Sequence, residues 1–339
     1  MILIVTNSLT GGGAERAMNT LANALYARGE EVQVIAINAG QSDLVELECK
    51  FTCLDRPHQA GFKDTFEAFR NFYNLVSQSK PDHIVLNCDL PEVFGALLPQ
   101  RFKLTLVEHS QRPFGTRKFL GLIIRIVLLI RKVDCVRVAS HFGIWCMPKK
   151  IAEVIPNALP TAHFTPRQLP KHSTASRLVY VGRLANPQKN PGICLDIAQE
   201  IDMPVTFYGE GTEKIKLQDS ARVRGIDADF AGQVIDPWEF IGESDVLIIP
   251  SRFEGDGLVV VEAIMKDIKF LVSDIPDFRR FNLPKEFYCE SASDFASRIM
   301  QLQNGKLALD ISEIQKSQII QSRNPSRLAE QWVRHFAST

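Results

Sequence analysis

Strand-like and helix-like segments alternate along almost the whole chain, with one pause. Continuous apolar runs such as Ile2–Thr6, residues 32–37 and residues 178–182 are typical of parallel strands that are buried on both faces. Between such runs lie segments with helical spacing of apolar residues, such as Phe62–Ser79. This order of strand, helix and strand predicts doubly wound α/β structure, in which helices cover both faces of a parallel sheet.

The alternation pauses at residues 155–176, a stretch rich in proline, serine and threonine that reads as a linker. A chain of 339 residues also exceeds what one hydrophobic core usually supports. We therefore predict two Rossmann-like doubly wound domains, residues 1–158 and residues 172–324, that face a cleft. Open α/β sheets bind ligands beyond the carboxyl ends of their strands, so the cleft is where function is expected.

Composition excludes several functional classes. Lys+Arg and Asp+Glu are equal at 39 each, so nothing in the overall charge points to nucleic acid. The seven cysteines show no CxxC spacing, and the N-terminal segment has no basic region before its apolar run. Both features predict a cytoplasmic protein with reduced thiols. The sequence contains neither HExxH nor clustered histidines, so no metal site is predicted.

Two carboxylates, Glu254 and Glu262, stand eight positions apart after a predicted strand at residues 245–249. The run Leu258–Met265 is apolar on every side except at Glu262, which predicts a buried helix. A carboxylate in such a helix needs a partner, because a buried unpaired charge is costly. A glycine-containing loop leads into the helix, whose first N–H groups are free to bind an anion. A phosphorylated sugar or a nucleotide suits this pattern, because its phosphate can bind the N–H groups and its hydroxyl groups can bind the carboxylates.

Two cations, Arg183 and Lys189, follow the predicted strand at residues 178–182. A pair of cations on one strand-end loop suits a diphosphate. The alternative is a solvated basic loop, but the position at a strand's carboxyl end favours a binding role. The glycine turns at residues 209–211 and at Gly232 follow the next strands, and each by itself indicates only a turn.

In the first half, residues 11–13 are glycines between a strand and a helix, where the backbone can approach a ligand closely. The run GGGAE does not match the GxGxxG dinucleotide pattern, and a simple tight turn explains it equally well. His109 follows the predicted strand at residues 103–108. Such a histidine is either a hydrogen-bonded loop residue or a group facing the predicted cleft.

Taken together, the segments GGGAE, VGRL…KN, GEG, FAG and EGDGLVVVE resemble family 4 of the retaining glycosyltransferases, the glycosyl transferases group 1. The resemblance implies the GT-B architecture. In it, residues 1–158 lie on the acceptor side and residues 172–324 bind the nucleotide sugar. It also implies that the final helix, within residues 325–339, crosses back to the first domain.

The resemblance implies a role for each candidate residue. Arg183 and Lys189 would hold the donor diphosphate and stabilise the leaving group, in place of a metal ion. Glu254 would contact the donor sugar, and Glu262 would accept hydrogen bonds from the ribose. His109 would lie near the transferred sugar and the acceptor, which completes a catalytic set of Arg183, Lys189, Glu254 and His109. The other predicted donor-binding positions are Gly12, Gly13, Gly209, Gly232, Gly255, Gly257 and Leu258.

One position departs from the family pattern. Asp256 stands where relatives often carry an apolar or aromatic residue, which puts the donor-sugar contacts in question. The diphosphate and ribose contacts are unaffected. No cofactor is expected, and the donor is a nucleoside-diphosphate sugar for which UDP is favoured over GDP.

The implied reaction moves a hexosyl or N-acetylhexosaminyl group to a glycan or lipid-linked acceptor with retention of anomeric configuration. The expected process is synthesis of a bacterial cell-surface polysaccharide, such as lipopolysaccharide, capsule or exopolysaccharide. The alternatives are a nucleotide-sugar epimerase of the same architecture and a non-catalytic protein that binds sugar nucleotides.

The apolar residues 119–130 are too few to span a bilayer and include Arg125. Cations surround and interrupt this run: Arg112, Arg117, Lys118, Arg125, Arg131 and Lys132. A basic apolar helix of this kind lies either on an anionic membrane surface or in the core with its cations reaching out to water, and we favour the core. The first alternative predicts a peripheral protein, bound through residues 112–132 to the cytoplasmic face of the inner membrane.

Overall fold

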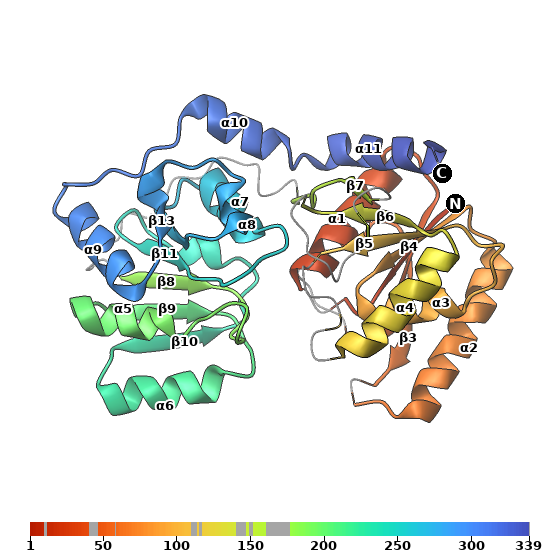
Figure 1. The fold of residues 1–339 in the computed structure, drawn as a ribbon, viewed down its shortest axis with the longest axis horizontal. Coiled ribbons are helices and arrows are strands. Elements are labelled where there is room, and N and C mark those ends of the chain that lie inside the picture. The colour runs from red at the N-terminus through yellow and green to blue at the C-terminus, as the bar shows by residue number, and fades with distance from the viewer. Residues whose placement is uncertain are drawn as a thin grey trace. The chain divides into compact units, whose positions relative to one another are not determined.

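The structure is a computed structural model, and it describes residues 1–9, 12–40, 47–57, 59–109, 114, 117–139, 147–148, 152–160 and 177–338. The chain forms two compact units, one of Met1–Thr161 with Ser322–Thr339 and one of Ala162–Gln321. Each unit is built around one parallel sheet flanked by helices (Figure 1). The predicted α/β class with two doubly wound sheets is confirmed. The cleft between them stays a prediction, and so do the functional roles of the domains.

The sheet of unit 1 has the order β3-β2-β1-β4-β5-β6-β7, and every neighbouring pair is parallel. Its strands are β1 (Ile2–Thr6), β2 (Val32–Asn38), β3 (Lys50–Arg56), β4 (His83–Asn87), β5 (Leu104–Glu108), β6 (Asp134–Arg137) and β7 (Ala152–Val154). The chain runs outward from β1 in one direction and from β4 in the other. The switch point of unit 1 therefore lies between β1 and β4.

Helices cover both faces of this sheet. Unit 1 contains α1 (Gly13–Ala27), α2 (Phe62–Ser79), α3 (Asp89–Leu97), α4 (Lys118–Ile130) and α11 (Pro325–Ser338). Successive side chains of a strand point to opposite faces. Ile2 and Ile4 of β1 accordingly lie in a core cluster with α1 and α11. Leu3 and Val5 lie in a second cluster with α2, α3 and α4.

The final helix, α11, packs against α1 in unit 1 although the chain has meanwhile traversed unit 2. Its buried side chains Leu328, Trp332 and Phe336 recur at intervals of four residues, so they line one stripe of the helix. The Phe336 ring also stacks on His83 of β4, with 4.8 Å between the ring centroids. The apolar stripe of α11 thus covers part of one face of the unit 1 sheet.

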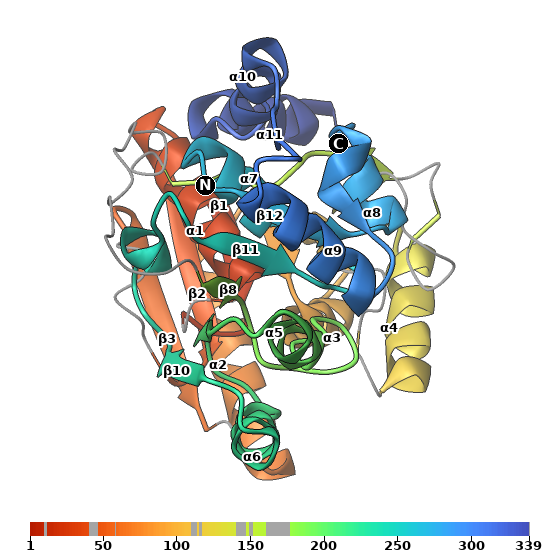
Figure 2. The ribbon, with the colours of Figure 1, turned by 90° about the vertical axis from the view of Figure 1, so that its left-hand side faces the viewer.

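The sheet of unit 2 has the order β10-β9-β8-β11-β12-β13, again entirely parallel. Its strands are β8 (Leu178–Val181), β9 (Val205–Tyr208), β10 (Ala228–Gly232), β11 (Val246–Ile249), β12 (Phe270–Ser273) and β13 (Tyr288–Cys289). The α-helices are α5 (Ile193–Ile201), α6 (Lys214–Arg224), α7 (Leu258–Met265), α8 (Pro276–Arg279), α9 (Ala292–Gln303) and α10 (Glu313–Gln321), with short 3₁₀ turns at Pro237–Phe240 and Lys285–Phe287. Side chains of α5, α6 and α9 share one core cluster with the sheet, and α7 packs on α10 (Figure 2).

The helix predicted at residues 119–130 is confirmed as α4, and the favoured core interpretation holds only for one side of it, where Ile124 and Leu128 lie in the core cluster of unit 1. Most of its apolar side chains are exposed, whereas Arg125 is buried. Within the described residues, no helix is long and apolar enough to cross a bilayer.

Candidate functional site

Four of the predicted site residues follow the two central strands of unit 2. Arg183 and Lys189 come after β8, and Glu254 and Glu262 come after β11. β8 and β11 are neighbours in the sheet, while β9 and β12 lie on their outer sides. The loops after β8 and β11 therefore diverge at the switch point of the sheet. A crevice of this kind is the usual ligand site of an open α/β sheet.

Lys189 and Glu254 meet directly across this switch point. Lys189 Nζ lies 2.6 Å from Glu254 Oε1, and Ser251 Oγ donates to the same oxygen at 2.6 Å. Glu254 Oε2 has no hydrogen bond within the described part of the chain. The Glu254 side chain is buried, whereas the Lys189 side chain is partly exposed. The pair thus fixes the ammonium group at the sheet edge and leaves a carboxylate oxygen available to a hydroxyl group.

Arg183 lies on the same loop and is exposed. Its Nη2 donates to Gln188 Oε1 at 3.1 Å, and its backbone carbonyl accepts a hydrogen bond from the Tyr180 hydroxyl at 2.9 Å. The loop is tied to the β11 loop by the hydrogen bond from Arg252 N to the Gln188 carbonyl, at 2.8 Å. Two cations are therefore held on one short loop, with the charge of Arg183 turned toward solvent.

The glycine loop before α7 has a backbone that only glycine adopts easily at one position. Gly257 caps the helix in the left-handed region, with φ of 62°. A Cβ atom there would also lie 3.2 Å from Phe278 and 3.3 Å from Phe281. Gly255 is buried, and Leu258 is half-exposed at the first turn of α7. The first turn of this helix has N–H groups of the kind that suit an anion, and Leu258 at its start is partly exposed.

Glu262 lies in the second turn of α7 and is 4% exposed. Its helical neighbours Val260, Val261 and Ala263 are fully buried. The carboxylate therefore belongs to a buried, otherwise apolar helix, as the sequence predicted, and this helix follows the loop that carries Glu254.

Asp256, the departure from the family pattern, forms an internal ion pair. Its carboxylate lies 2.5 Å from Arg280 Nη2, and the same guanidinium also bonds to the Asp256 carbonyl. The Asp256 side chain is almost fully buried. The charge of Asp256 is thus neutralised by Arg280. The aspartate anchors the glycine loop to the segment after α8.

Backbone hydrogen bonds join the glycine turns at the carboxyl ends of β8, β9 and β10. Gly182 N donates to the Tyr208 carbonyl at 2.9 Å, and Gly209 N donates to the Gly232 carbonyl at 2.7 Å. A Cβ atom on Gly209 would lie 2.0 Å from the Gly182 carbonyl oxygen, so no larger residue fits. Gly209 and Gly232 therefore allow three strand-end loops to lie against one another.

In unit 1, Gly12 and Gly13 lie at the start of α1, beside the switch point between β1 and β4. Gly12 is the N-terminal cap, and the Glu15 carboxylate folds back over it, 2.1 Å from where a Cβ atom of residue 12 would lie. Ser8 Oγ donates to Glu15 Oε1 at 3.4 Å. The Glu15 carboxylate therefore lies over the start of α1, where the sequence had predicted that the backbone could approach a ligand closely.

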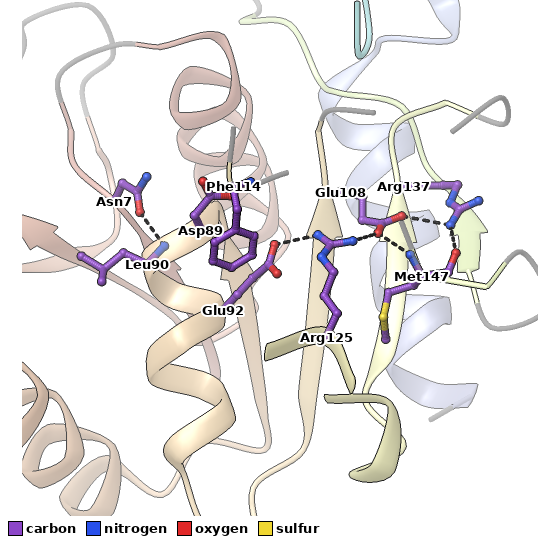
Figure 3. A network of polar contacts seen from close by, with 9 residues as sticks. All are labelled: Asn7, Asp89, Leu90, Glu92, Glu108, Phe114, Arg125, Arg137 and Met147. Atoms are coloured by element: carbon purple, nitrogen blue, oxygen red, sulfur yellow. Dashed lines mark hydrogen bonds and ion pairs between the residues drawn. The ribbon is translucent and has the colours of Figure 1, made fainter. Parts of the chain in front are cut away.

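His109 follows β5 and is half-buried. Beside it lies a buried polar network that the sequence did not predict (Figure 3). Glu108 accepts hydrogen bonds from Arg125 Nη1, from Arg137 Nη2 at 2.9 Å and from Met147 N at 2.7 Å. Arg125 also donates from Nη2 to Glu92 Oε1 at 2.9 Å. The residue immediately before His109 is thus fixed by two arginines.

Glu92 stands at the edge of this network and is 2% exposed. Burial raises the pKa of its carboxyl group from 4.5 to about 8, against the opposing effect of Arg125. The folded state therefore holds this proton more tightly than the unfolded chain does. Its contribution to stability is complete below about pH 4.5 and is lost as the pH rises through about 8.

Replacing Glu92 by glutamine should flatten this pH dependence. The free energy of unfolding of the wild type should fall relative to that of the variant, by up to about 1.4 kcal/mol per pH unit, as the pH rises from 5 to 8. Urea denaturation at several pH values measures this. As a control, Glu67→Gln removes an exposed acid and should leave the two curves parallel. Parallel curves for Glu92→Gln as well would refute the raised pKa.

Some polar residues of the site were missed by sequence reasoning. Ser251 holds Glu254, Gln188 holds Arg183, and Arg280 holds Asp256. Ser251 could have been found, because it is the first polar residue after the β11 strand and Pro250. Gln188 and Arg280 carry no pattern that separates them from surface residues. Within the described residues, no group of three or more His, Cys, Asp or Glu side chains could hold a metal ion.

This arrangement suits an anionic ligand that also carries hydroxyl groups. Two cations and an open helix start can bind phosphate oxygens, and two buried carboxylates can accept hydrogen bonds from sugar hydroxyls. All of these groups lie at the carboxyl edge of one sheet.

Comparison with known proteins agrees with this chemistry. Residues 163–318 match the family model described as Glycosyl transferases group 1. A Campylobacter jejuni protein is 24% identical over 283 residues, which are 79% of this chain and 77% of the relative. It is named GalNAc-alpha-(1->4)-GalNAc-alpha-(1->3)-diNAcBac-PP-undecaprenol alpha-1,4-N-acetyl-D-galactosaminyltransferase.

Two further likenesses extend the comparison. A Staphylococcus aureus poly(ribitol-phosphate) alpha-N-acetylglucosaminyltransferase is 25% identical over 185 residues, 50% of this chain and 37% of the relative. The crystal structure of Anabaena HepE in complex with UDP and glucose has a TM-score of 0.83 at 15% identity. It covers 100% of this chain and 99% of that chain, and so shows that the two share a fold over their whole length.

Proposed function

We propose that this chain is a glycosyltransferase of the glycosyl transferases group 1 family that takes a sugar from a nucleotide sugar and moves it, with retention of anomeric configuration, to a glycan or lipid-linked acceptor. The match of residues 163–318 to the family model and the likeness to the Campylobacter jejuni relative support this proposal. The observation that carries the proposal is the contact between Lys189 and Glu254 at the switch point of unit 2, with Arg183 and Glu262 on the same two loops. The two cations can bind the diphosphate of a nucleotide sugar, and the two carboxylates can bind its sugar hydroxyl groups.

We assign the diphosphate to Arg183, Lys189 and the first turn of α7. Negative charge builds up on the leaving diphosphate as the glycosidic bond breaks, and fixed cations stabilise it. The Lys189–Glu254 contact holds the ammonium group in place before the donor binds. The proposed reaction therefore needs no metal ion, and the leaving phosphate itself assists deprotonation of the acceptor.

We assign the donor sugar to Glu254 and the backbone of Gly255, Gly257 and Leu258, and the ribose to Glu262. Gly209 and Gly232 border the donor through the packed loops after β9 and β10. On unit 1, Gly12, Gly13 and His109 are proposed to meet the sugar and the acceptor. UDP is the preferred nucleotide, which is consistent with the UDP complex of Anabaena HepE.

The names of two relatives support a more specific donor and acceptor. The Campylobacter jejuni and Staphylococcus aureus proteins are both named as N-acetylhexosaminyltransferases, and the name of the first contains PP-undecaprenol. We therefore propose an N-acetylhexosaminyl donor and a lipid-linked acceptor in synthesis of a bacterial cell-surface polysaccharide, at the cytoplasmic face of the inner membrane.

Two measurements test the proposal. A thermal-shift screen of UDP, GDP, ADP and their sugars should show the largest rise in melting temperature with UDP or a UDP-sugar, because a ligand that binds the native state stabilises it. Release of UDP from the selected sugar nucleotide should then require a lipid-linked glycan acceptor. Isomerisation of the donor without any acceptor would instead identify an epimerase, and donor binding without turnover would identify a binding protein.

Replacing Glu262 by alanine should weaken UDP binding roughly 10- to 100-fold, because a hydrogen bond to a charged group contributes about 1.5–3 kcal/mol. Titration calorimetry with UDP measures the dissociation constant. Glu67→Ala is the control, because Glu67 is an exposed acid of α2 in unit 1, and its loss should leave the affinity for UDP unchanged. Unchanged UDP affinity in folded Glu262→Ala protein would remove Glu262 from the ribose site.

A further inference from the structure

α4 buries Ile124, Leu128 and one charged residue, Arg125, and exposes a second apolar side. Phe119, Ile123, Ile126 and Ile130 are 83%, 59%, 47% and 73% exposed, although isoleucine and phenylalanine are usually buried. Arg125, in the middle of the helix, is 5% exposed. We define the α4 apolar face as Phe119, Leu122, Ile123, Ile126, Leu129 and Ile130. It lies on the yellow helix of Figures 1 and 2.

Arg125 fixes which side of the helix faces outward. Its guanidinium bridges Glu108 of β5 and Glu92 of α3, and both carboxylates are buried (Figure 3). Turning α4 to bury its apolar side chains would pull Arg125 away from both carboxylates, which is strongly unfavourable. Just beyond the helix, Arg131 donates to the carbonyls of Gly95 at 2.8 Å and Pro99 at 3.1 Å. The apolar face is therefore held outward at both the middle and the end of α4.

The charged residues of the chain segment that carries this face have one sign. From residue 109 to residue 133 the sequence contains no Asp or Glu. Arg117, at the start of α4, and Lys132, just after its end, are both exposed. An exposed apolar stripe with cations at its two ends is complementary to an anionic bilayer, where headgroups meet the cations and acyl chains meet the stripe.

We propose that the α4 apolar face docks this chain on the anionic leaflet of a membrane, with α4 lying in the plane of the interface. A second copy of the chain is the competing occupant of such a face. A symmetric dimer would bring Arg117 and Lys132 of α4 against the same cations of the partner, and like charges oppose that contact. An anionic leaflet has the opposite sign. The proposal is independent of the transferase assignment, because docking requires no donor or acceptor.

Co-sedimentation of the full chain with vesicles tests the proposal without any measurement of activity. We expect the protein to pellet with vesicles of phosphatidylglycerol and phosphatidylcholine at low salt. Binding should weaken with added salt and be much weaker on pure phosphatidylcholine, because salt screens the attraction of Arg117 and Lys132 to the headgroups.

A matched pair of double variants separates the face from the net charge. Ile123→Glu with Ile126→Glu should lower partitioning onto anionic vesicles roughly ten-fold or more, because both side chains lose apolar burial in the interface. Ile215→Glu with Val223→Glu is the control. These residues of α6 are 74% and 82% exposed, and the change in charge is identical. The control should bind as the wild type does.

A second measurement guards against misfolding of the first variant. Phe119→Trp should show a blue shift of tryptophan emission when anionic vesicles are added, since an exposed indole would enter the interface. Absence of vesicle binding by the wild type, or equal loss in both double variants, would overturn the proposal. A concentration-dependent dimer that is abolished by Ile123→Glu with Ile126→Glu would overturn it in favour of a second copy.

Discussion

Replacing Lys189 by alanine should lower the turnover number of sugar transfer by on the order of 10²–10³-fold, the usual effect of removing one preorganised group that stabilises charge in the transition state. The Lys189 ammonium group is held at the switch point of the unit 2 sheet, 2.6 Å from Glu254 Oε1. Its charge faces the place where the leaving diphosphate is proposed to lie. Steady-state kinetics at saturating donor measure the loss.

The loss should not reflect unfolding. Lys189 is partly exposed, and ion pairs of this kind contribute about 1 kcal/mol or less to stability. Lys189→Gln is a useful second variant, because its amide can still donate to Glu254 while the positive charge is gone. It should be nearly as inactive as Lys189→Ala, since the charge and not the hydrogen bond stabilises the leaving group.

Lys316→Ala is the matched control for this experiment. Lys316 is 24% exposed, against 22% for Lys189, and its Nζ also lies 2.6 Å from a carboxylate, that of Asp267. Asp267 follows the carboxyl end of α7, at the edge of the sheet where β12 begins. The control should retain wild-type turnover. Near-normal turnover in both Lys189 variants would place the diphosphate elsewhere.

Replacing Arg125 by leucine should lower the free energy of unfolding by about 3–5 kcal/mol, the usual effect of removing one partner from a buried ion pair. Glu92 and Glu108 would then stay buried without their shared guanidinium. Glu108 would retain Arg137 and the Met147 N–H group, whereas Glu92 loses its hydrogen-bonded cation. Urea denaturation at pH 7 measures the change.

A surface arginine supplies the control for Arg125→Leu. Arg222 pairs with Asp219 at 2.8 Å, but its side chain is 78% exposed. Arg222→Leu should change the free energy of unfolding by about 0.5 kcal/mol or less. The double variant Arg125→Leu with Glu92→Leu should recover part of the loss, because it removes one of the two carboxyl groups that would stay buried without Arg125. Equal effects of Arg125→Leu and Arg222→Leu would show that the network contributes little.

The fold class followed from the sequence because buried parallel strands leave a local pattern. Ile2–Thr6, Phe62–Ser79 and Leu258–Met265 were predicted with the bounds that the structure has. The elements that were missed carry weaker patterns. β3 is largely exposed, and β13 has two residues. α3 begins immediately after β4 with no intervening loop that the sequence could mark.

The composition of the unit 2 site could also be predicted, because its charged residues follow strands directly. In a parallel sheet all strands end at the same edge, so residues after neighbouring strands come together. Their contacts could not be predicted. That Lys189 bonds to Glu254 depends on the adjacency of β8 and β11, which are separated in the chain by β9 and β10.

The sequence by itself determined that this chain is a pair of doubly wound α/β units and that the residues of the proposed donor site follow β8 and β11. Both are local properties, set by apolar periodicity and by position after a strand. Only the tertiary structure decided the environment of each charge. Arg125 is 17 residues from Glu108 and 33 from Glu92 in the chain. Because only folding brings these three together, the sequence left open which side of α4 faces the core.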